Sequence, residues 1–328
     1  MTDSTTRRDM LKGADVAGAG LAAVAPALAG AAQGAKPAPN PTNRFPTEPF
    51  AEQKQPWPAL QRNMRPVPDC GETSYRGSGR LAGRKALVTG GDSGIGRGAV
   101  IAFAREGAAV AINYFPTEEP DAQDVAKLLR GEGHKIELIS GDLTDSAFCD
   151  ALPGRAAKAL GGLDIVVNNA AYQQSKASID EISFEQFDRT MKTNLYAMFH
   201  ICKAAIPMMK PGACIINTAS VNSVSPEKEL LDYATTKGGI LIFTKALAKQ
   251  LASKGIRVNA IAPGPIWTPL QVAGGQLPGE MHKFGQDTPL GRAGQPAELA
   301  GLYVTLADGS TSYTSGSLFS ANGGTGVA

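Results

Sequence analysis

The chain has 328 residues, of which 43% are hydrophobic and 19% are charged, so it is long enough for one large core or two modest domains. Its 32 basic and 30 acidic residues are nearly balanced, which excludes the basic surface of a nucleic-acid-binding protein. The four cysteines and three histidines have no metal-ligand spacing, so we predict no metal site and no disulfide framework.

The first thirty or so residues have the pattern of an export signal. Arg7 and Arg8 precede the apolar residues Met10 and Leu11, and an alanine- and glycine-rich run follows to residue 32. This order resembles a twin-arginine signal, and the run is too short and too rich in alanine for a membrane span. We therefore predict a signal peptide over residues 1–31 and a periplasmic location. A disordered basic tail on a cytoplasmic protein is the alternative.

Residues 32–80 are rich in proline and polar groups and show no helical or strand period. Large apolar side chains nevertheless recur in this stretch, which is unusual for a plain linker. We expect an extended arm that lies on the surface of the core or of a neighbouring subunit. Its expected anchors are Phe50, Trp57, Leu60 and Met64.

From Leu81 to the carboxyl end, short apolar runs alternate with segments of helical length. The predicted strands are residues 85–89, 109–114, 135–140, 164–168, 213–218, 257–262 and 317–321. The predicted helices include residues 96–106, 120–131, 184–208, 230–253 and 296–306. Such alternation predicts one α/β domain over residues 81–328, a doubly wound parallel sheet of about seven strands with helices on both faces.

The first predicted strand runs into a glycine-rich turn. Gly90 permits a tight turn, Gly94 lets a pyrophosphate approach the backbone, and Gly96 lets the helix pack closely on the strand. The helix that follows offers amide protons and a positive dipole end to phosphates. After the first strand of an alternating α/β chain, this pattern predicts a dinucleotide site. Residues 91–94 also resemble the Gly-Asp-Ser-Gly of trypsin-like serine proteases, but no histidine is suitably placed for a hydrolase.

Tyr233 and Lys237 are four residues apart in a predicted helix, so they share one helix face. A tyrosine has an ordinary pKa of about 10, and a neighbouring ammonium favours the phenolate and lowers that pKa. The two residues therefore form a plausible proton-transfer pair. Taken alone, this spacing is more often a half-buried ring beside a solvated charge.

Several further landmarks occur in a fixed order along the chain. They are Thr89-Gly-Gly-Asp-Ser-Gly-Ile-Gly96, Asn168-Asn-Ala-Ala171, Ser220, Tyr233-Ala-Thr-Thr-Lys237 and Pro263-Gly264. Together they resemble the short-chain dehydrogenase/reductase family over residues 81–324. The lead-in at residues 71–81, the Asp232-Tyr233 pair and the segment 263–269 are similar to the bacterial general-stress and glucose/ribitol dehydrogenase-like branch. The resemblance implies a Rossmann fold, an NAD(P)-dependent oxidoreductase acting on CH–OH groups, and a homotetramer.

The resemblance implies roles for four residues in catalysis. Tyr233 would be the general acid in reduction and the general base in oxidation, and Ser220 would hold the substrate oxygen beside it. Lys237 would lower the pKa of Tyr233 and bond the nicotinamide ribose. Asn194 would hold a water in a proton relay. A scaffold protein on the same fold, binding nucleotide without catalysis, is the alternative, but it would have no reason to retain this complete set.

The resemblance also implies which residues bind the nucleotide. Those expected at the pyrophosphate are Gly90, Ser93, Gly94, Ile95 and Gly96. Asp142 would bond the adenine amino group. Those expected at the ribose, nicotinamide and carboxamide are Asn168, Ala170, Tyr233, Lys237, Pro263, Gly264, Ile266 and Thr268.

NAD enzymes place an acid at the end of the second strand, and Tyr114 stands there instead. We therefore expect NADP, with NAD as the alternative. The sequence carries little information about the identity of the substrate. Residues 266–285 have the composition of a flexible lid, and Gln173, Asn222, Glu227 and Trp267 are candidates to reach a substrate. Polar side chains in these loops fit a sugar or polyol, although surface loops are polar in any case.

Overall fold

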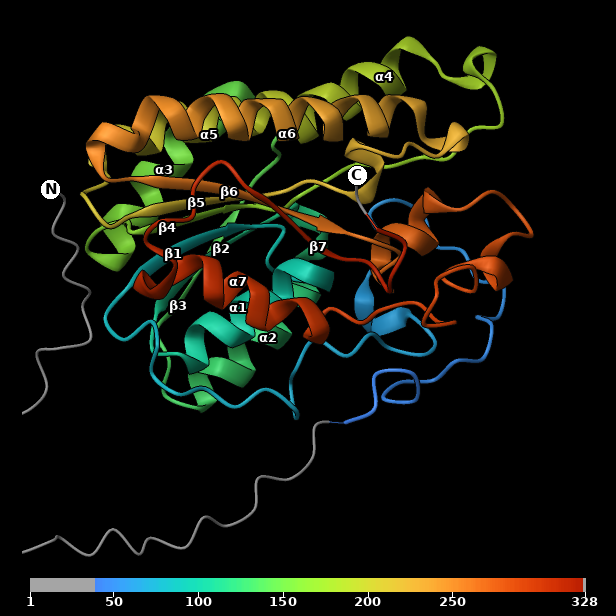
Figure 1. Cartoon of the computed structure of the whole chain (residues 1–328), viewed down its shortest axis with the longest axis horizontal. Helices are drawn as coiled ribbons and strands as arrows, with labels where there is room; N and C mark the ends of the chain where they lie inside the picture. Colours follow the sequence, from blue (N-terminus) through green and yellow to red (C-terminus); the bar gives the residue numbers. More distant parts are fainter. Residues whose placement is uncertain (1–38, 327–328) are drawn as a thin grey trace, which may run out of the picture. The chain divides into compact units, whose positions relative to one another are not determined.

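Seven parallel strands form one sheet in the order β3-β2-β1-β4-β5-β6-β7 (Figure 1). The computed structural model describes residues 39–326, so the predicted signal over residues 1–31 lies outside the described residues. The strands are β1 (Lys85–Thr89), β2 (Ala109–Tyr114), β3 (Ile136–Ser140), β4 (Ile165–Asn168), β5 (Cys214–Thr218), β6 (Arg257–Pro263) and β7 (Leu318–Ala321). The predicted parallel sheet is confirmed, and each predicted strand end is correct to within one residue.

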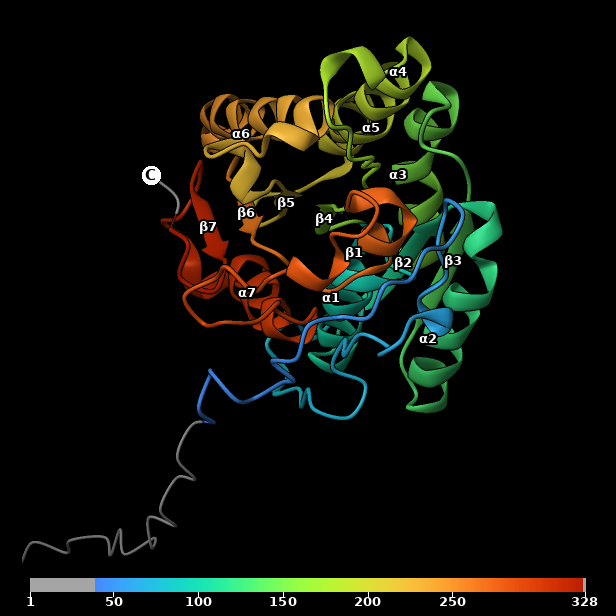
Figure 2. The same ribbon diagram turned by 90° about the vertical axis from the view of Figure 1, so that its right-hand side faces the viewer.

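Helices cover both faces of this sheet, as Figure 2 shows end-on. One face carries α1 (Gly94–Arg105), α2 (Glu119–Gly131) and α7 (Ala297–Ala307). The other carries α3 (Ser146–Leu160), α5 (Ala197–Ala205) and α6 (Leu231–Leu251), with α4 (Phe184–Met191) beside them. Because the strands are apolar on both sides, each face builds its own hydrophobic core against its helices. The described residues from 40 to 326 belong to one compact unit.

The helical segment predicted over residues 184–208 is confirmed, but it is not a regular α-helix throughout. The structure divides it into α4, a π-helical turn at Lys192–Tyr196, and α5. Asn194 lies in the π-helical turn. Its side-chain oxygen accepts a hydrogen bond from the Tyr172 N–H and its side-chain nitrogen donates one to the Tyr172 carbonyl, so the turn is anchored to the segment after β4. Such turns are frequent at functional sites. Among residues 39–326, no helix combines the length and the apolar character needed to cross a bilayer.

The arm packs on the domain of its own chain, along the edge where the strands end (Figure 2). Phe50 stacks on Trp267 with ring centroids 3.8 Å apart, and Met64 is fully buried. Trp57 packs against this same cluster, whereas Leu60 is partly buried outside it. The remaining members are Ala59, Val272, Ala273, Met281, Phe284 and Ala293. The arm and the segment 266–285 thus share a third, small hydrophobic core.

Candidate active site

Tyr233 and Lys237 lie in the first turns of α6 and are both buried. The Lys237 Nζ atom donates a 2.7 Å hydrogen bond to the backbone oxygen of Thr218, at the end of β5. The same nitrogen lies 5.1 Å from the centroid of the Tyr233 ring. The two side chains therefore share one helix face, and Lys237 joins α6 to the carboxyl end of the sheet.

Burial dominates the pKa values of both Tyr233 and Lys237 in this structure. Burial raises the pKa of Tyr233 to about 12, and a hydrogen bond with Ser220 opposes that rise. Burial also lowers the pKa of Lys237 to about 7. The reason is that water is withdrawn from both groups, which disfavours the phenolate and the ammonium alike. Tyr233 consequently rests as a neutral phenol, the form that can donate a proton.

Ser220 follows β5 in extended conformation and caps the short turn Val221–Ser223. Its Oγ atom accepts hydrogen bonds from the backbone N–H of Asn222 at 3.1 Å and from the Asn222 side-chain amide at 3.4 Å. Because both of these contacts use lone pairs, the hydroxyl hydrogen of Ser220 is left to donate. Ser220 therefore combines a structural cap with a donor that can face a substrate oxygen.

Asn194 is buried behind the catalytic pair. Its amide nitrogen donates to the Tyr172 carbonyl at 3.0 Å and to Thr236 Oγ1 at 3.1 Å, and its oxygen accepts from the Tyr172 N–H at 2.7 Å. It also lines a small cavity of about 10 Å³ between α5, α6 and the ends of β4 and β5. That volume is about the least that holds one water molecule. The placement suits the expected water-holding role.

A cavity of 180 Å³ runs along the carboxyl ends of the strands, where doubly wound sheets bind ligands. Most of the predicted nucleotide-binding residues line it. They are Gly90, Ser93, Gly94, Ile95, Tyr114, Asp142, Ala170, Tyr233, Pro263, Gly264, Ile266 and Thr268. Gly96 and Lys237 lie behind the wall instead. A Cβ on Gly96 would sit 1.9 Å from the backbone oxygen of Gly90, so this glycine closes the helix onto the turn.

Asn168 does not line the nucleotide cavity, contrary to the prediction. Its amide nitrogen donates to Asn217 Oδ1 at 2.8 Å and faces Cys202 Sγ, inside the core. Asn169 takes the cavity wall and donates to the backbone oxygens of Thr89 and Gly90. The two residues differ because successive side chains at the end of a strand point to opposite sides.

The glycine turn fits a pyrophosphate group. Gly90 and Gly94 adopt φ angles of +59° and +51°, a left-handed conformation that favours glycine. A Cβ on Gly94 would come within 3.0 Å of Thr268 Cγ2, so only glycine leaves this space for a ligand. The first-turn amides of α1 behind it lack intrahelical acceptors and point at anions. The residues present therefore suit the phosphates of a dinucleotide.

A second cavity of 660 Å³ meets the first at Ser220 and Tyr233, which line both. Most of its polar lining comes from the loops that follow β4, β5 and β6. These side chains include Gln173, Ser175, Asn222, Glu227, Glu229, Gln271, Gln276 and Asp287, together with the lysines Lys228 and Lys283. Trp267, a predicted substrate contact, is instead fully buried under the arm, and its indole N–H donates to the Pro66 carbonyl at 2.8 Å.

The chain matches the family model described as enoyl-(acyl carrier protein) reductase over residues 90–326. It is 54% identical over 288 residues to the uncharacterized oxidoreductase YhxD of Bacillus subtilis, covering 87% of this chain and 96% of that protein. The chain belongs to the short-chain dehydrogenase/reductase family. General stress protein 39 of Bacillus subtilis is 47% identical, over 85% of this chain and 97% of that protein. Glucose and ribitol dehydrogenase of Daucus carota is 41% identical, over 84% and 96% respectively.

A solved structure agrees with this membership. The short-chain dehydrogenase of Burkholderia cenocepacia in complex with NADP superposes with a TM-score of 0.70 at 29% identity. The match covers 75% of this chain and 98% of that one. The chain is therefore an oxidoreductase of the short-chain dehydrogenase/reductase family, a family that uses NAD(P) as its cofactor.

Two carboxyl groups in the nucleotide cavity of this short-chain dehydrogenase/reductase were not predicted. Asp92, in the glycine turn, is 1% exposed, and neither of its oxygens has a partner among the described residues. Burial raises the pKa of Asp92 to about 7 and that of the nearby Glu118 to about 9. A neutral carboxyl donates a hydrogen bond. The only signal for Asp92 in the sequence is its position after Gly91, within the glycine turn.

Asp232 is a further residue whose role the sequence did not reveal. It is 1% exposed, and its carboxylate accepts from Thr190 Oγ1 at 2.7 Å, from Gln186 Nε2 at 3.1 Å and from the Tyr233 N–H at 2.8 Å. These bonds join α4 to the start of α6. Asp232 therefore fixes the backbone from which Tyr233 projects. Its position next to Tyr233 was noted in the sequence only as a mark of the subgroup.

Proposed function

We propose that this short-chain dehydrogenase/reductase interconverts a polyhydroxylated alcohol and its carbonyl form, using NADP. The observation that carries the proposal is the second cavity, which opens on Ser220 and Tyr233 and is lined mainly by polar side chains. Amides, hydroxyls and carboxylates can bond several hydroxyl groups at once. Its 660 Å³ is within the range of small-molecule sites.

In the proposed reaction the bound nicotinamide nucleotide supplies or accepts the hydride. Tyr233 donates its phenolic proton to the substrate oxygen in reduction and takes it back in oxidation. Ser220 donates a hydrogen bond to the same oxygen and holds it beside the tyrosine. Lys237, bonded to the Thr218 carbonyl, stands next to the phenol, where its ammonium form stabilises the Tyr233 phenolate left after reduction and returns a proton to it; Lys237 regains that proton from solvent.

A substrate screen tests this proposal. Purified full-length chain is supplied with NADP or NADPH and with glucose, ribitol, simple aldehydes and a crotonyl thioester, and the nicotinamide absorbance is followed. We expect the highest kcat/KM with a sugar or polyol, and a raised KM for that substrate in Asn222→Ala. A clear preference for the thioester or for apolar aldehydes would contradict the substrate class. Absence of turnover with every compound would favour the nucleotide-binding scaffold.

The preference for NADP is supported by Tyr114, which replaces the acid that NAD enzymes use for the ribose 2′-hydroxyl. The Burkholderia cenocepacia relative was crystallised with NADP. Asp92 and Glu118 stand in the same cavity, and with raised pKa values they can donate to a hydroxyl or to a phosphate. We expect a lower KM for NADP than for NAD. A clear preference for NAD would overturn this part of the proposal.

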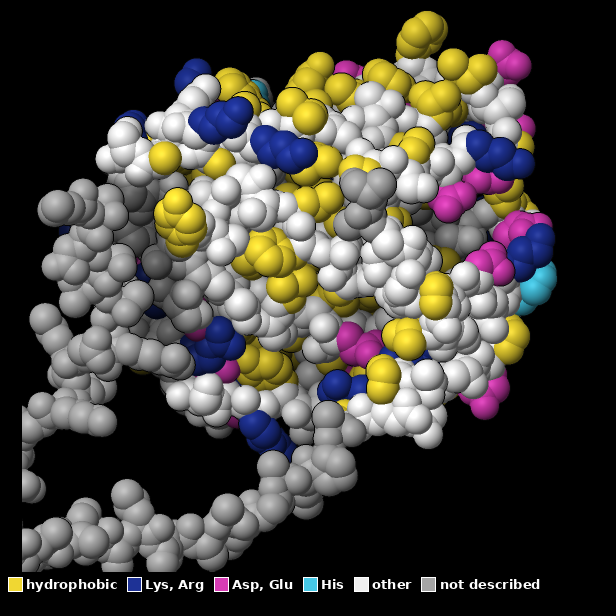
Figure 3. All heavy atoms as spheres, viewed as in Figure 1, with side chains coloured by type: hydrophobic (Ala, Val, Ile, Leu, Met, Phe, Trp, Pro, Cys, Tyr) yellow, Lys and Arg dark blue, Asp and Glu magenta, His cyan; other side chains and the backbone are white. Residues whose placement is uncertain are grey.

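We further propose that four chains assemble. Exposed apolar side chains gather along the edge formed by α5, α6 and the neighbouring α4 (Figure 3). Phe184 is 90% exposed and Ile242 is 64% exposed, with Phe187, Tyr196, Phe199 and Leu231 nearby. Such patches mark protein interfaces. Sedimentation is expected to give a tetramer for the wild type and smaller species for Ile242→Lys. A monomeric wild type would refute the assembly.

Export is proposed from Arg7 and Arg8 and the apolar run that follows them. The twin-arginine route moves folded proteins, so the nucleotide would be loaded before export. Residues 1–35 fused to a folded reporter are expected to direct it to the periplasm. Replacing both arginines by lysine is expected to retain it in the cytoplasm. Secretion that survives this double replacement would exclude the route.

A further inference from the structure

The N-terminal arm supplies part of the wall of the nucleotide cavity. Trp57, Pro58 and Ala59 line it together with Tyr114 and Asp142, although they stand more than fifty residues earlier in the chain. The glycine turn, which suits the pyrophosphate, lies on the same cavity. The arm therefore contributes side chains where only the α/β domain was expected to do so.

The indole of Trp57 sits at the adenosine end of this cavity. Its ring centroid is 4.9 Å from that of Phe115, which follows β2, and 5.4 Å from that of Tyr172, which follows β4. The guanidinium of Arg189 stacks over the indole at 4.2 Å, and one of its nitrogens lies 4.0 Å from Asp142 Oδ2. Asp142 follows β3 and is the residue expected to bond adenine. The neighbours of Trp57 thus surround the place of the base and its ribose.

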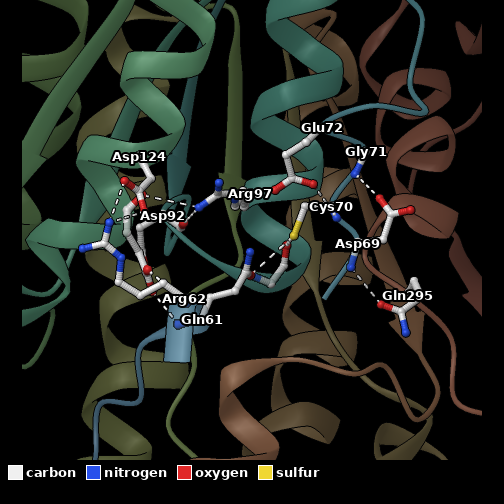
Figure 4. A network of polar contacts seen from close by, with 12 residues as sticks. Gln61, Arg62, Asp69, Cys70, Gly71, Glu72, Asp92, Arg97, Asp124 and Gln295 are labelled. Atoms are coloured by element: carbon white, nitrogen blue, oxygen red, sulfur yellow. Dashed lines mark hydrogen bonds and ion pairs between the residues drawn. The ribbon is translucent and has the colours of Figure 1, made fainter. Parts of the chain in front are cut away.

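The arm is fixed at this position by polar contacts, which include a buried glutamine and an exposed ion pair (Figure 4). The backbone N–H of Gln61 donates to Asp121 Oδ2 at 2.6 Å, and Arg62 pairs with Asp124 at 2.7 Å, so the arm is joined to α2. The side-chain oxygen of Gln61 accepts from the N–H of Gly94 at 2.7 Å. One buried glutamine therefore connects the arm directly to the glycine turn.

Contacts beyond Gln61 join the next part of the arm to α1 and to the segment before α7. Cys70 Sγ donates to the Gly94 carbonyl at 3.5 Å, and Glu72 pairs with Arg97 of α1 at 2.9 Å. The N–H of Asp69 donates to Gln295 Oε1 at 3.0 Å (Figure 4). Because the arm is anchored on α1, on α2 and on the residues before α7, it is an integral part of the nucleotide cavity.

The chain's two tryptophans differ in a way that points to a ligand at one of them. Trp267 is fully buried and its N–H is bonded to the Pro66 carbonyl, as in a core residue. Trp57 is only partly buried and lines the cavity, and no described residue accepts a hydrogen bond from its indole N–H. An aromatic face and a free donor at the adenosine end are suited to stacking on a base.

We propose that Trp57 is a nucleotide-binding residue that covers the adenosine half of the cofactor, and that Gln61 is a positioning residue for the glycine turn. The proposal rests on the use of a nicotinamide nucleotide, which the family shows, and it does not depend on the substrate. Because the indole contacts the end of the nucleotide that does not react, it acts on binding and leaves the chemical step unchanged.

Dissociation constants for NADPH and for ADP, measured by calorimetry on the full-length chain, test the proposal. Trp57→Ala is expected to raise both constants about tenfold, since stacking of a base on an aromatic side chain is worth about that factor or more. Trp57→Phe keeps a ring and is expected to stay near the wild type. Unchanged or tighter binding of both probes to Trp57→Ala would overturn the proposal.

Phe50→Ala is the matched control. It removes an aromatic side chain of the same arm that stacks on Trp267 and does not line the nucleotide cavity. Equal weakening of ADP binding by Phe50→Ala and Trp57→Ala would show that only the seating of the arm matters, and would refute a direct contact. The wild type is titrated first. If it binds neither NADPH nor ADP, then the proposed cofactor use fails together with this inference.

Fluorescence supplies an independent readout. In Trp267→Phe the remaining tryptophan is Trp57, because the chain has only two. Excitation of this indole is expected to transfer energy to bound NADPH, and ADP is expected to quench its emission. Indole emission that NADPH and ADP leave unchanged, under conditions where calorimetry shows binding, would place Trp57 away from the nucleotide.

Discussion

The two cavities that meet at Ser220 and Tyr233 are built in different ways. The nucleotide cavity is built around the glycine turn and the carboxyl ends of the strands, and the second cavity mainly from polar side chains of loops. The first therefore depends on backbone geometry, which a motif specifies. The second depends on how loops pack, which short patterns do not specify. Ser220 and Tyr233 lie where the two cavities meet.

The arm modifies this comparison. It closes the nucleotide cavity with Trp57 while packing its apolar side chains against the segment 266–285, from which Gln271 and Gln276 reach the substrate cavity. The arm thus forms part of the wall of the nucleotide cavity and packs against the segment that supplies part of the wall of the second cavity. Substitutions at the junction, in the arm and between α4 and α6 are expected to change different measurable properties.

The largest effect is expected at the junction. Tyr233→Phe removes only the phenolic oxygen, so the ring still fills its buried site. General acid–base catalysis is worth about 10²–10⁴-fold, and kcat/KM is expected to fall by that factor. Nucleotide affinity, measured by calorimetry, should stay at the wild-type value. If turnover persists at the wild-type rate, then the proton comes from elsewhere.

Loss of arm packing is the next largest effect. Met64 is fully buried between the arm and the 266–285 segment, and Met64→Ala is expected to cost about 2–5 kcal/mol of stability. Thermal denaturation measures the loss, and limited proteolysis shows whether the arm is released first. Val67→Ala is a matched control, because Val67 is 52% exposed on the same arm and should change little. Equal stability of the two variants would mean that the arm is not part of the folded unit.

Asp232→Ala tests the contact between α4 and α6. It leaves the donors of Thr190, Gln186 and Tyr233 without their buried acceptor, at a cost of about 1–3 kcal/mol. Denaturant unfolding measures this cost. The effect should extend to kcat, since the backbone of Tyr233 loses its anchor, while ADP affinity stays unchanged. Reduced ADP affinity with a normal kcat would show instead that Asp232 supports the nucleotide cavity and not the position of Tyr233.

Per pH unit, the smallest effect is the dependence of stability on the ionisation of Lys237. Burial lowers the folded-state pKa of Lys237 to about 7, whereas the unfolded chain keeps that proton up to a pH of about 10. Between these values the unfolded state binds more protons, so the contribution of Lys237 makes stability rise with pH, by at most about 1.4 kcal/mol per pH unit. Lys237→Met should remove that contribution. Parallel stability curves for Lys237→Met and the wild type over this range would show that the lysine stays charged when folded.

Much of the fold could be predicted from the sequence because strands apolar on both faces and a glycine turn have local signatures. The seven strands and the nucleotide turn followed directly from such patterns. The π-helical turn at Asn194 did not, because it depends on bonds to Tyr172, which lies on another segment. The misplacement of Asn168 came from a single strand residue whose side chain points inward rather than outward.

The remaining differences have one physical cause, which is burial by distant segments. The pKa of Tyr233 rises because its surroundings exclude water, an effect that the spacing to Lys237 cannot show. Trp267 was expected to face a substrate, but Phe50 of the arm covers it. Glu118 and Asp92 line the nucleotide cavity together although they come from different turns. Each of these depends on contacts between parts of the chain that are far apart in the sequence.

The central claim is that Ser220 and Tyr233 act together on one substrate oxygen at the junction of the two cavities. A double-mutant cycle on kcat/KM with Ser220→Ala and Tyr233→Phe tests it most directly. The account predicts strong non-additivity, with the double variant no slower than Tyr233→Phe alone. Losses that multiply in the double variant would show that the two hydroxyls act independently, and would contradict the claim.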